Sequence, residues 1–123
     1  MSPVSRQTAP VLEKMYQFVL WLIPTVEKFP RTQKFLLGDR LQTSALDVLE
    51  GLIDAAYTRN RGAILQRVNL GLEKLRYLFR LAQDLRYLDM RRYEFAARAL
   101  EEIGRMVGGW MKAGNAEASR QPV

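Results

Sequence analysis

The sequence contains neither cysteine nor histidine, and these two absences exclude most catalytic and metal-binding chemistry. Without these side chains, the usual pairs of nucleophile and general base cannot form. Zinc loses its two favoured ligands, and the Glu-x-x-His pairs of a carboxylate di-iron bundle are impossible. We therefore predict a protein that is not an enzyme and that uses no metal ion and no cofactor.

A long apolar run is also missing. The longest, from Phe18 to Pro24, is much shorter than the roughly 20 residues that cross a membrane. The opening residues, Met1 to Arg6, lack the apolar core of a signal peptide, and the lack of cysteine fits a reducing compartment. The sequence thus predicts a cytoplasmic protein with no membrane partner.

The apolar residues that are present predict four helices in a single domain of 123 residues. Apolar side chains recur at intervals of three and four, and no segment alternates with the period of two that a strand shows. The expected helices cover residues 10–28, 32–57, 61–87 and 89–112. Short connections favour antiparallel neighbours, so we expect an all-α, up-down-up-down four-helix bundle.

Local signals set the expected ends of this bundle. Pro10 is suited to the first turn of the first helix, Pro24 should kink its last turn, and Asp89 is a candidate N-cap for the fourth helix. The bundle should therefore occupy residues 10–113. A flexible N-terminus of residues 1–9 and a disordered tail of residues 114–123 should flank it.

The formal net charge of +6 is concentrated in the second half of the chain. Residues 1–58 contain six basic and six acidic side chains, whereas residues 59–112 contain twelve basic and six acidic ones. Arginine, which dominates the excess, pairs bidentately with phosphate and stacks on bases, so we predict an anionic polymer as a partner. We include Arg61, Arg67 and Lys74 in this binding site; alternatively, the charge only keeps a basic bundle in solution.

The polar face of the third expected helix carries the best binding candidates. Arg76 and Arg80 are four residues apart and should project together, with Tyr77 beside them. Such a group can hold a phosphate and stack on a base. The alternative is a solvated face, on which Glu73 pairs with Arg76 and Asp84 with Arg80, because surface ion pairs of this kind contribute only ~0–1 kcal/mol.

The apolar surface of the third helix is wider than a single bundle needs. Leu81 and Leu85 lie outside its main stripe, and Trp21 lies opposite the stripe of the first helix. Because outward tryptophans often anchor interfaces, we assign these three residues to an interface between subunits. The alternatives are a third helix that is central to its own bundle, and a Pro24 kink that turns Trp21 inward.

The polar faces of the second and fourth helices favour ordinary surfaces. Asp47, Glu50 and Asp54 form an acidic stripe on the second helix, but without histidine this is a weak metal signal, and a solvated face or a docking patch for arginines is the better interpretation. The fourth helix carries Glu–Arg pairs four residues apart, which neutralise one another. Gly104 and Gly108 line one of its edges, where a neighbouring helix should approach closely.

Five short strings occur together and in order along the chain. They are Trp21-Leu22-Ile23-Pro24, Lys28-Phe29-Pro30-Arg31, Leu37-Gly38-Asp39-Arg40, Leu72-Glu73-Lys74-Leu75-Arg76 and Ile103-Gly104-Arg105-Met106-Val107-Gly108-Gly109-Trp110. Each string alone is weak, but the ordered set, which covers roughly residues 15–113, resembles the accessory variability determinant (Avd) proteins of diversity-generating retroelements. The same four-helix superfamily contains the ribosomal-RNA intervening-sequence proteins.

The resemblance implies a basic four-helix bundle that assembles as a barrel-shaped homopentamer. Such proteins bind the reverse transcriptase of the retroelement and its template RNA, and they support the synthesis of adenine-mutagenised cDNA that diversifies a target gene. The basic stretch of the third helix matches the partner-binding segment of the family, which implies Arg76 and Arg80 as binding residues. The expected partners are therefore reverse transcriptase, RNA or RNA/DNA, and further copies of the chain.

Two other functions remain open at the level of the sequence. A structural or RNA-associated bundle of the intervening-sequence type, with no retroelement role, would show the same helices and charge. An enzyme that uses the carboxylates of the second helix and a divalent metal is the least favoured function, because nothing else in the sequence supports it.

Overall fold

The computed structural model describes the backbone of residues 8–120 and the side chains of residues 10–114. The helical elements are α1 (Thr8–Val26), α2 (Arg31–Gln33), the π-helix η1 (Lys34–Gly38), α3 (Asp39–Ala56), α4 (Gly62–Asp84) and α5 (Met90–Arg120). Because α2, η1 and α3 follow one another without a break, they form one long helix. The described part of the chain is thus built from four long helices and contains no strand.

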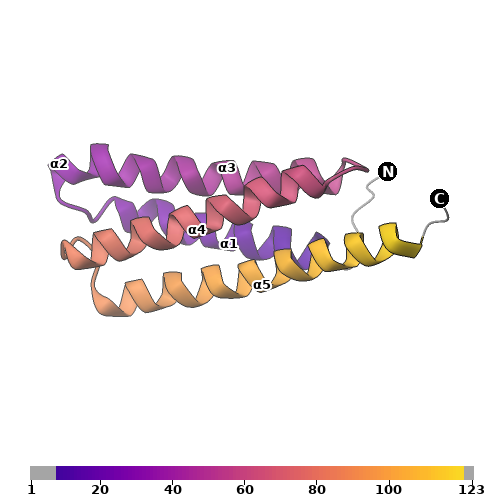
Figure 1. The fold of residues 1–123 in the computed structure, drawn as a ribbon. Coiled ribbons are helices and arrows are strands. Elements are labelled where there is room, and N and C mark those ends of the chain that lie inside the picture. Colours follow the sequence, from indigo (N-terminus) through magenta and orange to yellow (C-terminus); the bar gives the residue numbers. More distant parts are fainter. Residues whose placement is uncertain (1–7, 121–123) are drawn as a thin grey trace.

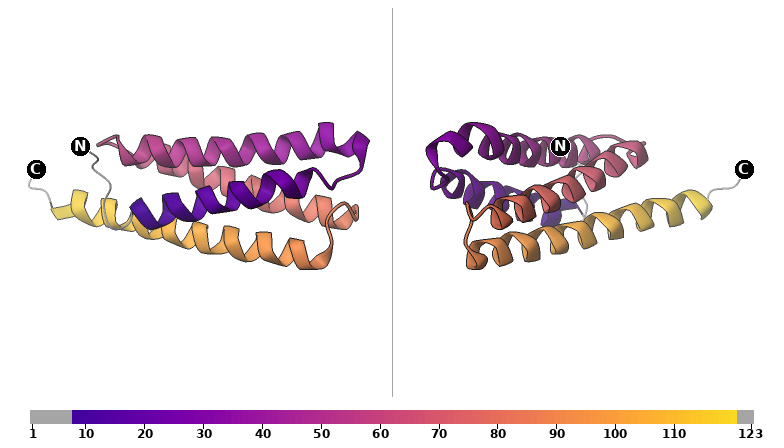
Figure 2. Two further views of the ribbon diagram at one scale, coloured as in Figure 1. Left: turned by 180° about the vertical axis from the view of Figure 1, so that it is seen from behind. Right: turned by 60° about the vertical axis from the view of Figure 1, so that its left-hand side comes forward.

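The four long helices run up, down, up and down along one axis (Figure 1). Helix α1 packs against α3 and α5, and α4 packs against the same two helices, so α1 and α4 lie diagonally opposite each other. The view from behind in Figure 2 shows α1 in front of the other helices. Helix α5 is the longest, with 31 residues, and its last turns project beyond the neighbouring helices.

The observed helix ends differ from the expected ones at a few positions. Helix α1 starts at Thr8, with Pro10 in its first turn as predicted, and it ends two residues after Pro24. Helix α5 continues through Gly114 to Arg120, beyond the end at residue 112 that the sequence predicted. One glycine costs a helix only ~1 kcal/mol relative to alanine, and the alanines and glutamate that follow favour the helix. Residues 1–7 and 121–123 lie outside the described part of the chain.

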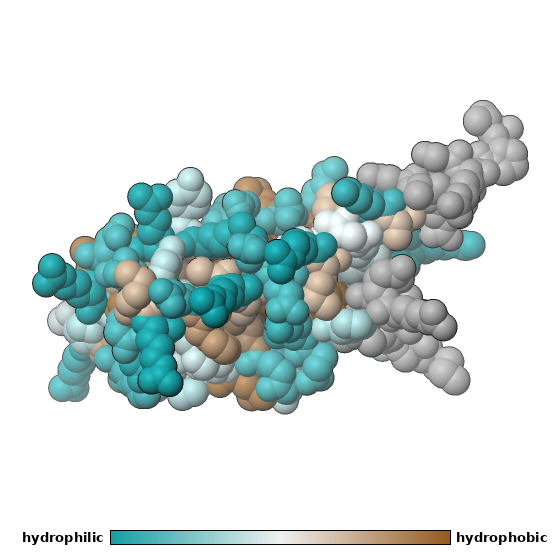
Figure 3. All heavy atoms as spheres, turned by 90° about the horizontal axis from the view of Figure 1, so that it is seen from below, coloured by the Kyte–Doolittle hydropathy of each residue, from teal (hydrophilic) through white to brown (hydrophobic). Residues whose placement is uncertain are grey.

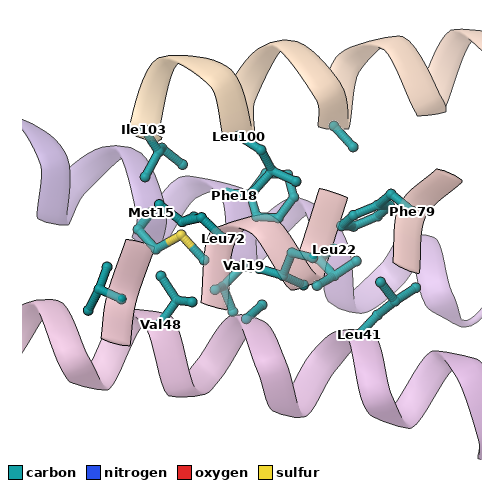
Figure 4. Packing of buried hydrophobic residues seen from close by; sticks show 14 of the residues in the cluster. Met15, Phe18, Val19, Leu22, Leu41, Val48, Leu72, Phe79, Leu100 and Ile103 are labelled. Carbon is teal, nitrogen blue, oxygen red and sulfur yellow. The ribbon is translucent and has the colours of Figure 1, made fainter. Parts of the chain in front are cut away.

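The core lies between the four helices and contains the apolar stripes that the sequence predicts. Figure 4 shows part of it, including Met15, Phe18 and Leu22 of α1, Leu72 and Phe79 of α4, and Leu100 and Ile103 of α5. These side chains are almost completely removed from water. Burial of apolar surface at ~25 cal/mol per Å² is the main force that holds the helices together.

Helices α3 and α4 approach each other closely at two glycines. A Cβ atom at Gly51 would lie 2.7 Å from Cγ2 of Val68, and one at Gly71 would lie 2.9 Å from Cγ2 of Val48. Each glycine therefore makes room for a valine of the opposite helix. This close contact fixes the spacing between the acidic helix α3 and the basic helix α4.

Candidate partner-binding surface of α4

The outward surface of α4 combines cations with apolar side chains. Leu70, Tyr77 and Leu81 lie seven and four residues apart on the exposed side of the helix, and the side chain of Tyr77 is 69% exposed. On a helix of 3.6 residues per turn, Lys74 and Arg80 lie on either side of this apolar row. We call Arg67, Leu70, Lys74, Tyr77, Arg80 and Leu81 the α4 face.

Arg67 and Lys74 line a groove between α4 and α3 that also contains the acidic stripe of α3. The groove has a volume of about 480 Å³ and is bordered by Asp47, Glu50 and Asp54. Among the described residues, no ion pair joins these carboxylates to either cation. Within the same part of the chain, no cluster of three acidic side chains is arranged to hold a metal ion.

Arg80, which the sequence predicted as a binding residue, is exposed and only weakly paired. Its side chain is 66% exposed, and its Nε lies 3.9 Å from Oδ2 of Asp84, at the outer limit of an ion pair. An exposed pair of this kind contributes ~0–1 kcal/mol and is easily exchanged for another anion. Arg80 can therefore hold an incoming phosphate or carboxylate without loss of a strong internal contact.

Arg76 does not project together with Arg80 as the sequence suggested. Its Nη2 donates a hydrogen bond of 3.3 Å to the carbonyl oxygen of Leu100 on α5, and its Nη1 lies 3.6 Å from Oε2 of Glu73. The Nε atom is buried and has no hydrogen-bond partner. With a side chain that is 40% exposed, Arg76 links α4 to α5 and presents only part of its charge to the solvent.

Arg61 also lies away from the α4 face. It precedes the first residue of α4, and its Nε donates a hydrogen bond of 3.1 Å to the carbonyl oxygen of Thr58. Its guanidinium carbon lies 5.3 Å from the ring centre of buried Trp110 on α5, a cation–π contact. The structure thus brings Arg67, Lys74, Tyr77 and Arg80 to one surface, whereas Arg61 and Arg76 are turned toward α5.

The residues predicted to contact other subunits have different surroundings. Leu81 and Leu85 are about half exposed, so their assignment to an interface between subunits stays a prediction. Trp21 is half-buried, and its ring centre lies 4.6 Å from that of Phe95 on α5 and 5.6 Å from that of Phe18. The expected outward orientation of Trp21 is therefore wrong, because neighbouring aromatic rings cover much of its surface.

Sequence reasoning missed the groove that contains Trp21 and Phe95. The groove lies between α1 and α5 and includes Lys14, Arg91 and Arg98. The only signal in the sequence is that Phe95 falls outside the apolar stripe of α5. A helical wheel does not show which residue of another helix lies beside it.

The start of α5 is fixed as the sequence predicted. The carboxylate of Asp89 accepts a hydrogen bond of 2.8 Å from the backbone N–H of Arg92, which confirms the N-cap. This backbone hydrogen bond, together with the guanidinium of Arg92 at 2.6 Å, lowers the pKa of Asp89 below its ordinary value of 3.8. The cap places the basic first turn of α5, including Arg91, beside the groove.

A family described as bAvd-like matches residues 10–114, which is most of the chain and all four long helices of the bundle. The chain belongs to the bAvd-like family. No curated protein matches the sequence.

Membership of the bAvd-like family confirms the resemblance to Avd proteins. The four-helix, all-α structure agrees with this family. The family suggests an accessory protein of the retroelement type, which is a non-catalytic kind of protein. Of the described helices, none is both long and apolar enough to span a lipid bilayer.

Proposed function

We propose that this bAvd-like protein is a non-catalytic accessory protein of a diversity-generating retroelement. It binds the reverse transcriptase and nucleic acid, either template RNA or cDNA, in the cytoplasm and supports mutagenic cDNA synthesis. The observation that carries this proposal is the α4 face, where Lys74 and Arg80 flank exposed Tyr77, with Arg67 further toward the start of the helix, and none of the three cations has a strong ion pair with the described carboxylates.

The chemistry of the α4 face suits a large anionic or mixed partner. Arginine side chains bind phosphate or carboxylate through charge-assisted hydrogen bonds. Tyrosine supplies apolar area and one hydroxyl group, and both Tyr and Arg are enriched among the residues that dominate binding energy at interfaces. Leu70 and Leu81 add apolar area on both sides of Tyr77. Such a surface can bind a polymerase, and its cations can also hold an RNA backbone.

Self-association is the second part of the proposal, with a ring of five subunits as the expected form. Exposed apolar rows occur on α1, formed by Tyr16, Leu20 and Ile23, and on α3, formed by Leu46 and Ile53. The row on α3 lies away from the α3–α4 groove, on the flank next to α1. Contiguous exposed apolar surface is a common mark of an interface between proteins.

Charge also favours contact between unlike surfaces of neighbouring subunits. Asp47, Glu50 and Asp54 give α3 an acidic side, whereas the second half of the chain is basic. An interface that joins unlike surfaces closes into a ring when the rotation permits. Leu85, at the end of α4, extends the apolar surface that such a ring can cover, whereas Leu81 belongs to the α4 face.

The test combines mass measurement with binding. Light scattering should give the mass of an oligomer, and this mass should increase when purified reverse transcriptase from the same genomic locus is added. An Arg80→Ala variant should remain helical but bind the enzyme more weakly. Substitution of Arg105 by alanine, which removes a single exposed charge on α5, is the control and should retain binding.

The alternative is an intervening-sequence type of bundle without a retroelement role. It predicts a stable oligomer that does not bind reverse transcriptase in the same titration. It also predicts a genomic locus without a reverse-transcriptase gene and without a pair of near-identical repeats. A monomer that binds neither enzyme nor RNA would contradict both functions.

A further inference from the structure

We propose that the groove between α1 and α5 binds single-stranded nucleic acid. A base stacks on the side chain of Phe95, and Arg91 and Arg98 hold the adjoining phosphates. This inference rests on the proposed function, because it locates a strand that the protein is proposed to bind. The groove lies on the α1 side of α5, whereas the α4 face lies on the outer side of α4.

The floor of the groove is an aromatic cluster that starts in the core and ends in the solvent. Phe79 is buried, and its ring centre lies 5.7 Å from that of Phe18 and 6.4 Å from that of Trp21. Trp21 in turn lies 4.6 Å from Phe95, with an angle of 41° between the two rings. Phe95 is 49% exposed and ends the cluster. The core thus holds Trp21 in place behind an accessible ring, which is a suitable platform for stacking.

Two cations lie on either side of this platform. Arg91 is four residues before Phe95 and Arg98 is three residues after it, and both side chains are exposed. At about 100° per residue, both project within about 60° of Phe95, and they are separated by about 10 Å along the helix axis. Among the described residues, neither takes part in an ion pair. The guanidinium groups are therefore free to bind phosphates next to a base that stacks on the ring.

The two carboxylates of the groove offset only part of this positive charge. Oε2 of Glu102 lies 2.8 Å from Nζ of Lys14, so this pair bridges α1 and α5 and is neutral. Glu94 also lines the groove, three residues after Arg91 and four before Arg98, and among the described residues it forms no ion pair with either. With two unpaired arginines and one unpaired carboxylate, the groove keeps an excess of one positive charge. The face on which α5 lies shows polar side chains around an apolar patch (Figure 3).

A single strand fits these features better than a duplex does. Bases in a duplex are stacked on one another and are not available to a protein ring, whereas an unpaired base can stack on it. The groove has a volume of about 800 Å³, within the range of pockets that hold small ligands, so it has room for a nucleotide. Template RNA and newly made cDNA both present this chemistry.

The experiment measures the binding of fluorescein-labelled 15-nucleotide oligo(U) RNA, oligo(dT) DNA and a duplex of the same length. The single strands should bind more tightly than the duplex, and a preference for RNA or for DNA shows which single strand uses the groove. Phe95→Ala should weaken binding of the single strand about 5- to 150-fold, the effect of one lost stacking contact. Phe95→Tyr keeps the ring and should bind as the wild type does, which controls for folding.

Two further measurements test the charge and the stacking separately. Arg98→Ala should reduce the slope of log affinity against log salt concentration by about 0.7, which corresponds to one phosphate contact on a single strand. Arg105→Ala removes the same charge two turns further along α5 and should leave the slope unchanged. In a Trp110→Phe background, the fluorescence of Trp21 should change when oligo(U) binds.

Three results would overturn the proposal, and they are distinguishable. Equal affinity of wild type and Phe95→Ala, with no change in Trp21 fluorescence, excludes the groove but leaves nucleic-acid binding at the α4 face. If the Phe95→Ala variant no longer binds reverse transcriptase but still binds the oligonucleotide, the groove is a protein-docking site. If the wild type binds no oligonucleotide at all, the nucleic-acid part of the proposed function fails as well.

Discussion

The guanidinium group of Arg76 occupies the space that a side chain on Gly104 would need. A Cβ atom at Gly104 would lie 2.9 Å from Nη2 of Arg76, the same atom that donates a hydrogen bond to Leu100. The glycine in α5 thus accommodates an arginine from α4, and the two residues lie within two different strings of the family resemblance. The close approach that the sequence predicted at Gly104 exists, but it involves a side chain rather than a helix backbone.

We expect Gly104 and Arg76 to be energetically coupled. Gly104→Ala alone should change the free energy of unfolding little, because the helix gain of ~1 kcal/mol offsets the loss of the Arg76 contact. In an Arg76→Ala background, the same substitution should stabilise the protein by about 1 kcal/mol. Urea unfolding of the four proteins of this double-mutant cycle gives the coupling, and strictly additive effects would show that the contact is absent.

Arg76 and Arg80 should differ in what they contribute. Arg76→Ala removes a contact between α4 and α5 and should lower the free energy of unfolding by about 1 kcal/mol. Arg80→Ala removes only an exposed pair at 3.9 Å and should change it by less than about 0.5 kcal/mol. Thermal unfolding followed by circular dichroism measures both values. Equal losses would mean that the contact of Arg76 with Leu100 adds nothing to stability.

The contact between α3 and α4 should be sensitive to added volume at its two glycines. Gly51→Ala would place a methyl group 2.7 Å from Val68, and overpacking of this kind costs about 1–3 kcal/mol. Gly109→Ala meets no atom within 4 Å and should stabilise the protein by about 0.5–1 kcal/mol. Chemical denaturation measures the free energy of unfolding of both variants. In the Gly51→Ala background, Val68→Ala should restore much of the free energy of unfolding that Gly51→Ala loses. A stabilised Gly51→Ala variant would contradict the close approach.

The Asp89 cap predicts a dependence of stability on acid pH. Because the pKa of Asp89 is lower in the folded protein than its ordinary value of 3.8, its ionised form stabilises the fold above that value. This contribution is lost as the pH falls through the lower, folded-state pKa. Asp89→Asn keeps an oxygen that accepts the bond from Arg92 but does not titrate. When both proteins are melted at each pH, the melting temperature of Asp89→Asn should therefore fall less between pH 5 and pH 2 than that of the wild type.

The sequence predicted the fold well because the fold depends on local patterns. Apolar residues at three- and four-residue spacing defined the four long helices, and the short polar side chain of Asp89 marked the start of α5. The predicted end of α5 was wrong because a single glycine at position 114 is a weak helix terminator. The π-helix of Lys34–Gly38 was not predicted, since no residue type in that segment signals a helical turn with an extra residue.

The candidate site was harder to predict because it depends on contacts between helices. A helical wheel places Arg76 and Arg80 on one polar arc but does not show that Gly104 of α5 leaves room for one of them. The same limit applies to Trp21, whose partner Phe95 is far away in the sequence. Charge and exposure were predictable for Arg67, Lys74, Tyr77 and Arg80, which depend only on the outward face of one helix.

The affinity of reverse transcriptase for the wild-type protein and for Arg80→Ala tests the central claim most directly. The enzyme should be titrated onto immobilised protein at one fixed salt concentration, with Arg105→Ala as the matched control. We predict that Arg80→Ala weakens binding about 10-fold or more, the effect of one lost charge-assisted hydrogen bond, without a change in melting temperature. Equal affinities of wild type and Arg80→Ala would contradict the assignment of the α4 face as the binding surface.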